Sequence, residues 1–207
     1  MLFKQYGNVR INVNEMNIDA LSMSGHKFYG PKGIGALYVR DGIQFDKLQD
    51  GGHQERNKRA GTENVPGIVG IGKALEIAYT DFDKKSAYIK NLRDYYIVQI
   101  KDKIKDIRIN GDVQNRLPGN INISFKNVDG ESLLLKLDEK GICVSTGSAC
   151  NSDSQDVSHV LSAIGVEKEY IEGSLRVTLG LDNTKEDIDY LVKNLKDSVK
   201  ILRDINE

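Results

Sequence analysis

A lysine and a histidine stand among small hydroxyl residues and glycines in Ser22–Gly35, which reads SMSGHKFYGPKGIG. Glycines surround Pro31 after Lys27, and they predict a sharply bent loop, because glycine tolerates positive φ and proline fixes its own. An amine beside an anion-binding loop is what Schiff-base enzymes need. A solvated surface lysine is the alternative, and these residues alone leave both interpretations open.

Three further side chains could donate a hydrogen bond to a phosphate. Ser24 and His26 precede Lys27 directly, and Thr62 lies in the polar loop 50–67. Gly25 and Gly30 have the spacing of a P-loop, but proline follows Gly30 where that motif needs lysine, so we exclude it. His53 and His159 are interpreted as structural histidines.

The two cysteines differ in their surroundings. Cys150 lies in the loop 146–156, TGSACNSDSQD, whose small polar residues predict an exposed thiol that could attack as a nucleophile or exchange disulfides. An incidental surface cysteine is the alternative. Cys143 stands between Ile142 and Val144, and it is predicted to be buried and inert.

Arg176 interrupts an apolar segment, residues 173–179, which reads GSLRVTL. Burying a charge alone is costly, so this guanidinium needs a partner. Asp182 is one candidate. An anionic substrate in a pocket is the other, because a guanidinium donates two parallel hydrogen bonds to a carboxylate.

The composition excludes several classes of protein. The formal net charge of −1 over 207 residues provides no basic surface for nucleic acid or an anionic membrane. No apolar run is long enough to span a bilayer, and the start MLFKQYGNVR lacks the apolar core of a signal peptide. Two cysteines without CxxC spacing predict a cytoplasmic protein with reduced thiols, and we expect no metal site.

The first half of the chain must position the lysine. Residues 21–24 and 35–40 are predicted strands, antiparallel to each other, with Lys27 between them. Residues 1–19 are predicted to hold a strand or a short helix-to-strand entry. The polar loop 50–67 lacks hydrophobic periodicity, so it is either functional or disordered.

Helical periodicity begins near Pro66 and runs to about Lys105, as one long helix or two in tandem. The apolar positions at helical spacing are Ile68, Ile71, Leu75 and Ala78, followed by Ile89, Leu92, Tyr96 and Ile100.

The second half reads as a small α/β domain. Its predicted elements are a strand at 120–125, a helix at 130–140 closed by Gly141, a short strand at 142–145, a helix at 157–164 ended by Gly165, a strand at 173–179, and a last helix capped by Thr184. The apolar stripe of that last helix is Ile188, Leu191, Val192, Leu195, Val199 and Leu202.

Four motifs together closely resemble the cysteine desulfurases of the NifS and IscS type, within the aminotransferase-like enzymes that use pyridoxal 5′-phosphate (PLP). They are residues 24–35 (SGHKFYGPKGIG), 51–62 (GGHQERNKRAGT), 147–150 (GSAC) and 174–180 (SLRVTLG). The resemblance covers nearly the whole chain. It implies an α/β fold: an incomplete large PLP-binding domain at 1–80, a linking helix at 81–105, and a small C-terminal domain at 106–207 that carries the cysteine loop.

The resemblance also implies roles for the residues of the first half. Lys27 would hold PLP as a Schiff base and shuttle protons, and Ser24 and His26 would bind the cofactor phosphate. Thr62 would reach the phosphate of a neighbouring subunit, which implies a homodimer.

In the second half, Arg176 would clamp the carboxylate of the substrate L-cysteine. Cys150 would attack the substrate sulfur to give a persulfide and release L-alanine. The sulfur would then pass to an acceptor or scaffold protein for iron-sulfur cluster or thio-cofactor assembly.

Members of that family are much longer than this chain, and they carry an Asp-x-x-Gln pair that contacts the PLP ring. Alignment on Gly7 puts Met1 and Lys4 at those two positions. We therefore expect a partial family member with doubtful PLP occupancy and little activity alone. The alternative is a non-catalytic remnant that dimerises or binds partners.

Overall fold

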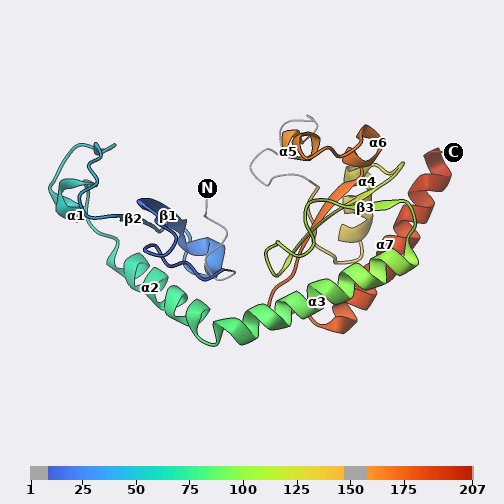
Figure 1. Ribbon diagram of the computed structural model, residues 1–207, viewed down its shortest axis with the longest axis horizontal. Helices are drawn as coiled ribbons and strands as arrows, with labels where there is room; N and C mark the ends of the chain where they lie inside the picture. The colour runs from blue at the N-terminus through green and yellow to red at the C-terminus, as the bar shows by residue number, and fades with distance from the viewer. Residues whose placement is uncertain (1–8, 147–157, 207) are drawn as a thin grey trace. The chain divides into compact units, whose positions relative to one another are not determined.

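The computed structural model describes residues 9–146 and 158–206, in two compact units, Met1–Asp83 and Lys84–Glu207 (Figure 1). In the N-terminal unit, strands β1 (Ala20–Ser24) and β2 (Gly35–Val39) pair antiparallel, from Ala20 opposite Val39 to Ser24 opposite Gly35. The 3-10 helix η1 (Gly25–Phe28) lies between them. Both predicted strands are confirmed, and so is the position of Lys27 between them.

The strand or entry predicted in the first 19 residues is wrong for the part that the structure describes. Residues 13–17 form turns, and the backbone amides of Asn14 and Glu15 donate to Asn12 Oδ1 at 3.1 and 3.3 Å. An asparagine side chain that accepts from the following backbone favours a turn over a sheet.

Two helices follow in this unit, the short α1 (Gln54–Asn57) and the longer α2 (Val65–Tyr79). The polar loop contains α1, where Glu55 and Arg56 have left-handed backbone angles. On α2, Ile71 is buried as predicted, but Ile68 is exposed. The face of α2 that packs on the lysine turn carries small residues. A Cβ on Gly70 would lie 2.6 Å from the Cγ of Pro31, so only glycine allows this approach.

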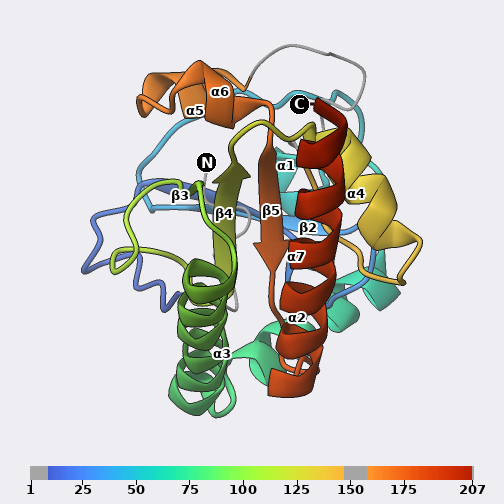
Figure 2. The ribbon, with the colours of Figure 1, turned by 90° about the vertical axis from the view of Figure 1, so that its right-hand side faces the viewer.

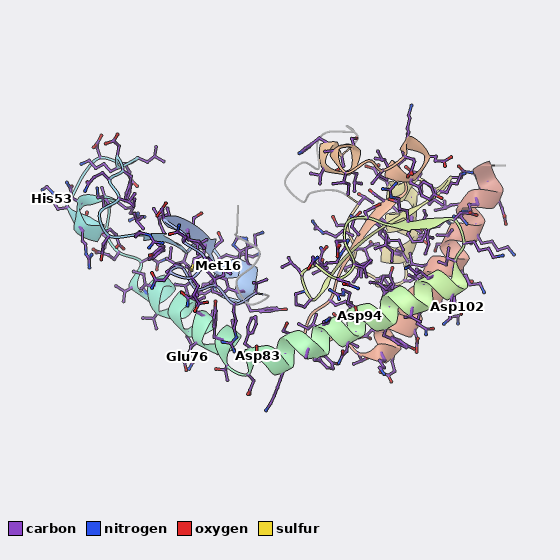
Figure 3. The ribbon with its side chains drawn as sticks, in the orientation of Figure 1. Met16, His53, Glu76, Asp83, Asp94 and Asp102 are labelled. Carbon is purple, nitrogen blue, oxygen red and sulfur yellow. The ribbon has the colours of Figure 1, made fainter. Side chains whose placement is uncertain are left out.

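A short break separates α2 from α3 (Phe82–Lys103), and Asp81 adopts a φ of 49° there. The tandem alternative is therefore the one that the structure adopts. The predicted apolar positions of α3 are all buried, namely Ile89, Leu92, Tyr96 and Ile100. Within the N-terminal unit, Arg10 forms a salt bridge with Asp83, which is labelled in Figure 3. The distance between Arg10 Nη2 and Asp83 Oδ2 is 3.0 Å.

The C-terminal unit is built on an antiparallel sheet with the order β3-β4-β5 (Figure 2). Its strands are β3 (Ile107–Ile109), β4 (Asn120–Phe125) and β5 (Ser174–Thr178). Its helices besides α3 are α4 (Gly130–Asp138), α5 (His159–Ala163), α6 (Lys168–Ile171) and α7 (Lys185–Asn206). The strand β3 and the helix α6 were not predicted.

One apolar core joins the sheet to α3, α4 and α7. The whole predicted stripe of α7 is buried in it. Thr184 caps this helix as predicted, since its Oγ1 accepts from the backbone amide of Asp187 at 3.2 Å. In the described part of the chain, no helix is both long and apolar enough to cross a membrane.

The segments around α4 and α5 correct two predicted boundaries. The short strand predicted at 142–145 is reduced to one bridge between Ser145 and Arg176. The helix predicted at 157–164 is α5, and Gly165 follows it with a φ of 70°. Gly141 ends α4 as predicted, with a φ of 72°, and the amide of Ile142 donates to the carbonyl of Leu137.

Candidate functional site

Lys27 lies on a tight turn that is anchored at both ends. The backbone amide of Gly25 donates to Ile34 and that of Gly30 donates to Gly25, each at 2.9 Å. Phe28 is buried in the small core of this unit. Tyr29 leaves the turn with a φ of 64°. The exposed Lys27 is therefore held by a fixed backbone.

The donors around Lys27 suit a cofactor that has a phosphate and a carbonyl carbon. Ser24 is the N-cap of η1, three residues before the lysine, and its own backbone is extended at the end of β1. His26 is exposed beside them. A hydroxyl and an imidazole can bind a phosphate, while the amine can form a Schiff base. The residues of this turn therefore fit PLP.

The loop around α1, where His53 is labelled in Figure 3, is held by hydrogen bonds between its own residues. The Nδ1 of His53 lies 3.3 Å from Asn57 Oδ1, and the amide of Gly61 donates to Gln54 Oε1 at 3.1 Å. Thr62 is exposed at its end. Among the described residues, no hydrogen bond joins its side chain to the lysine turn.

The C-terminal unit contains a cavity of about 280 Å³ on the polar face of its sheet. The described residues that line it carry two guanidiniums and no carboxylate. They are Asn110, Arg116, Asn120, Asn122, Thr146, Ser158, Val160, Leu161, Ile164 and Arg176. This lining favours an anionic ligand.

Arg176 enters this cavity from β5. Its backbone is fixed on both sides, by Asn122 directly opposite on β4 and by Ser145, whose carbonyl accepts from the Arg176 amide at 2.6 Å. Among the described ion pairs, none joins Arg176 to Asp182. The structure therefore favours the second alternative, a guanidinium that faces a pocket.

Arg116 is a cavity residue that the sequence analysis missed. Its Nε donates to the carbonyl of Asp112 at 2.8 Å and its Nη2 donates to the carbonyl of Asn110, while its buried Nη1 has no hydrogen-bond partner. Burial lowers the pKa of this guanidinium, and the nearby charge of Arg93 adds to that effect. The sequence did contain a signal for the polar face of the sheet. Asparagines alternate with isoleucines on β4, which places Asn120 and Asn122 on one polar face.

The cysteines give one correction and one prediction that stays open. Cys143 is exposed, contrary to the prediction, while its neighbours Ile142 and Val144 are half-buried against the core. Apolar neighbours on both sides therefore do not bury the residue between them. Cys150 lies outside the described residues, as do Met1 and Lys4.

Comparison with known proteins places these sites in a family. Residues 4–191 match the model described as Aminotransferase class-V. The chain belongs to this family. A cysteine desulfurase IscS from Dictyoglomus turgidum is 54% identical over 97% of this class-V chain, and one from Methanosarcina thermophila is 51% identical over 97%. The chain spans 51% and 49% of these two relatives, about half their length.

Solved structures agree with the class-V assignment. A NifS-like protein superposes on 96% of this chain with a TM-score of 0.85 and 33% identity, and 51% of that structure is covered. A structure titled "SspA in complex with cysteine" matches 87% of the chain with a TM-score of 0.65 and 34% identity. The fold is therefore that of part of a NifS-like enzyme, and the predicted family is confirmed.

Proposed function

We propose that this chain carries one part of a PLP-dependent cysteine desulfurase, which converts L-cysteine to L-alanine and a protein-bound persulfide. The observation that carries the proposal is the cavity that Arg176 enters. Thr146 and Ser158 also line this cavity, and they flank the segment that contains Cys150. The segment that contains the proposed nucleophile therefore begins and ends at the cavity that contains Arg176, the proposed carboxylate-binding residue.

Each residue then has a specific task. PLP, when bound, withdraws electrons from the substrate carbon skeleton. Lys27 would hold PLP through Nζ and, when Nζ is free again, would transfer protons, while Ser24 and His26 would donate to its phosphate. Arg176 binds the carboxylate of L-cysteine with two hydrogen bonds, which fixes the orientation of the substrate.

Cys150 accepts the sulfur. Its thiolate attacks the substrate sulfur, so that a sulfur–sulfur bond forms as the carbon–sulfur bond breaks. The electron pair of the broken bond remains on the substrate carbon, and protonation of that carbon by Lys27 gives L-alanine. The persulfide on Cys150 is then available to an acceptor or scaffold protein.

The assembly and location are also part of the proposal. Thr62 is exposed, so its hydroxyl is available to bind the phosphate in a second subunit of a homodimer. The small number of cysteines and their lack of CxxC spacing support a reducing compartment such as the cytoplasm.

A covalent labelling experiment tests the cofactor role. The chain is mixed with PLP, reduced with borohydride and digested, and the labelled peptide is identified by mass spectrometry. We expect label on Lys27, its loss in Lys27→Ala, and its retention in Lys32→Ala, because Lys32 lies exposed on the same loop. Equal labelling of Lys27 and Lys32 in the wild-type chain contradicts the assignment.

A second assay tests the nucleophile. L-Cysteine is added to the chain with PLP, and alanine is measured together with persulfide on the protein. Cys150→Ser removes the attacking thiolate, so any alanine formed by the wild type should be lost while the Lys27 label remains. Cys143→Ser is the matched control and should change neither result.

A second candidate function is a non-catalytic module that dimerises or binds partners. It is supported by the large apolar side chains that the N-terminal unit exposes, which include Leu37, Leu48 and Val69. The labelling experiment separates the two functions, because this module has no reason to hold PLP at Lys27.

A further inference from the structure

Arg116 has an unusual set of hydrogen bonds for a partly buried arginine. Two of its nitrogens are fixed on the backbone carbonyls of Asn110 and Asp112, and the buried Nη1 is left without a partner. A guanidinium held in this way has little rotational freedom, so its remaining donor has a defined direction. The same side chain lines the cavity, so its positive charge acts on a ligand that enters there.

Among the described residues, the charges near Arg116 leave an excess of positive charge in the cavity lining. Arg93, which lowers its pKa, already pairs with Asp94 at 2.7 Å. Asp112 attracts Arg116, but its Oδ1 accepts from the amides of Gln114 and Asn115 at 2.6 Å each. Arg176 adds a second guanidinium to the lining. The two guanidiniums of this described lining favour an anionic ligand.

We propose that Arg116 is a second anion-binding residue of this cavity, and that a small carboxylate entering it contacts both Arg116 and Arg176. The proposal deepens the proposed function, because it assigns the substrate carboxylate an additional contact. It requires only the described cavity and neither PLP nor Cys150. Two guanidiniums would make the cavity select carboxylates over neutral or cationic thiols.

The experiment is an NMR titration of the full chain, without PLP, with 3-mercaptopropionate. Cysteamine has the same thiol and an ammonium in place of the carboxylate. We expect 3-mercaptopropionate to shift the side-chain Nε–H signals of both Arg116 and Arg176 with one common dissociation constant, and cysteamine to shift neither. Equal shifts from the two compounds, or a shift of the Arg176 signal alone, overturns the proposal.

Variants make the test quantitative. Loss of one charge-assisted contact should weaken 3-mercaptopropionate binding about tenfold in Arg116→Gln and in Arg176→Gln. Arg108→Gln is the control, because Arg108 pairs with Glu167 and does not line the cavity. An Arg116→Gln affinity within about twofold of the wild type rejects the role of Arg116.

Two safeguards keep the result interpretable. If Arg116→Gln unfolds because it loses its backbone contacts, the wild-type Arg116 signal still decides, with Arg116→Lys used to assign it. A desulfurase assay that fails while 3-mercaptopropionate still binds both arginines rejects the proposed function and leaves this site standing. Buried water on Arg116 alone predicts no shift with either compound, and that outcome rejects the site.

Discussion

Asn122 lies directly opposite Arg176 on neighbouring antiparallel strands, and both residues line the same cavity. Directly opposed residues share one face of a sheet, with Cβ atoms about 5 Å apart. The Oδ1 of Asn122 already accepts from Asn110 Nδ2 at 2.6 Å. Asn122 is therefore placed to influence what the guanidinium of Arg176 binds.

This pairing predicts that Asn122→Asp inactivates the cavity without unfolding the unit. The new carboxylate lies opposite Arg176 and pairs with it, so an entering carboxylate finds its site occupied. We expect at least about tenfold weaker binding of 3-mercaptopropionate and an almost unchanged melting temperature. Gln114→Glu adds the same charge on an exposed loop, and binding reduced equally in that control would contradict the mechanism.

Two glycines of α2 give a matched test of how the lysine turn is held. A Cβ on Gly70 would lie 2.6 Å from Pro31 Cγ, whereas one on Gly72 would meet nothing within 4 Å. Gly70→Ala should separate α2 from the turn and reduce PLP labelling of Lys27. Gly72→Ala should leave labelling intact and stabilise the helix by up to about 1 kcal/mol. Equal labelling and equal thermal unfolding of the two variants would show that this contact is unimportant.

Asp112 predicts a dependence of stability on pH. Hydrogen bonds from the amides of Asn115 and Gln114 hold its pKa below the ordinary 3.8. The folded state therefore binds a proton less readily than the unfolded state, so this contribution is complete above the unfolded pKa and is lost as the pH falls through the folded pKa. Urea unfolding of wild type and Asp112→Asn should differ near neutral pH and converge at strongly acidic pH. A difference that is constant with pH contradicts this origin.

The two units should differ in resistance to proteolysis. The core of the C-terminal unit joins a three-stranded sheet to α3, α4 and α7, whereas the N-terminal core is Leu21, Phe28, Ile71 and Ala74 beside two strands. A two-stranded sheet is marginally stable by itself. Brief trypsin treatment, followed by mass spectrometry, should leave a fragment covering most of 84–207. Cleavage within α7 before cleavage in residues 20–60 would refute this.

Local patterns predicted the elements well where one periodicity dominated. The alternation in Asn120–Phe125 and the helical stripe of α7 needed only neighbouring residues, and both were confirmed. The prediction for Ile68 failed, because the small residues of α2 that approach Pro31 decide which face is buried. The prediction for Cys143 failed because Ile142 and Val144 pack against the core and leave the residue between them exposed.

The family and the proposed role of Lys27 follow from the order of residues along the chain, because the motif of that turn is contiguous and local. The surroundings of Arg176 depend on the folded sheet. Asn110, Arg116 and Asn122 are distant from it in the chain, and strand register together with two backbone carbonyls brings them to one cavity. The register between β4 and β5 depends on the packing of a whole sheet face, which no single segment of the sequence encodes.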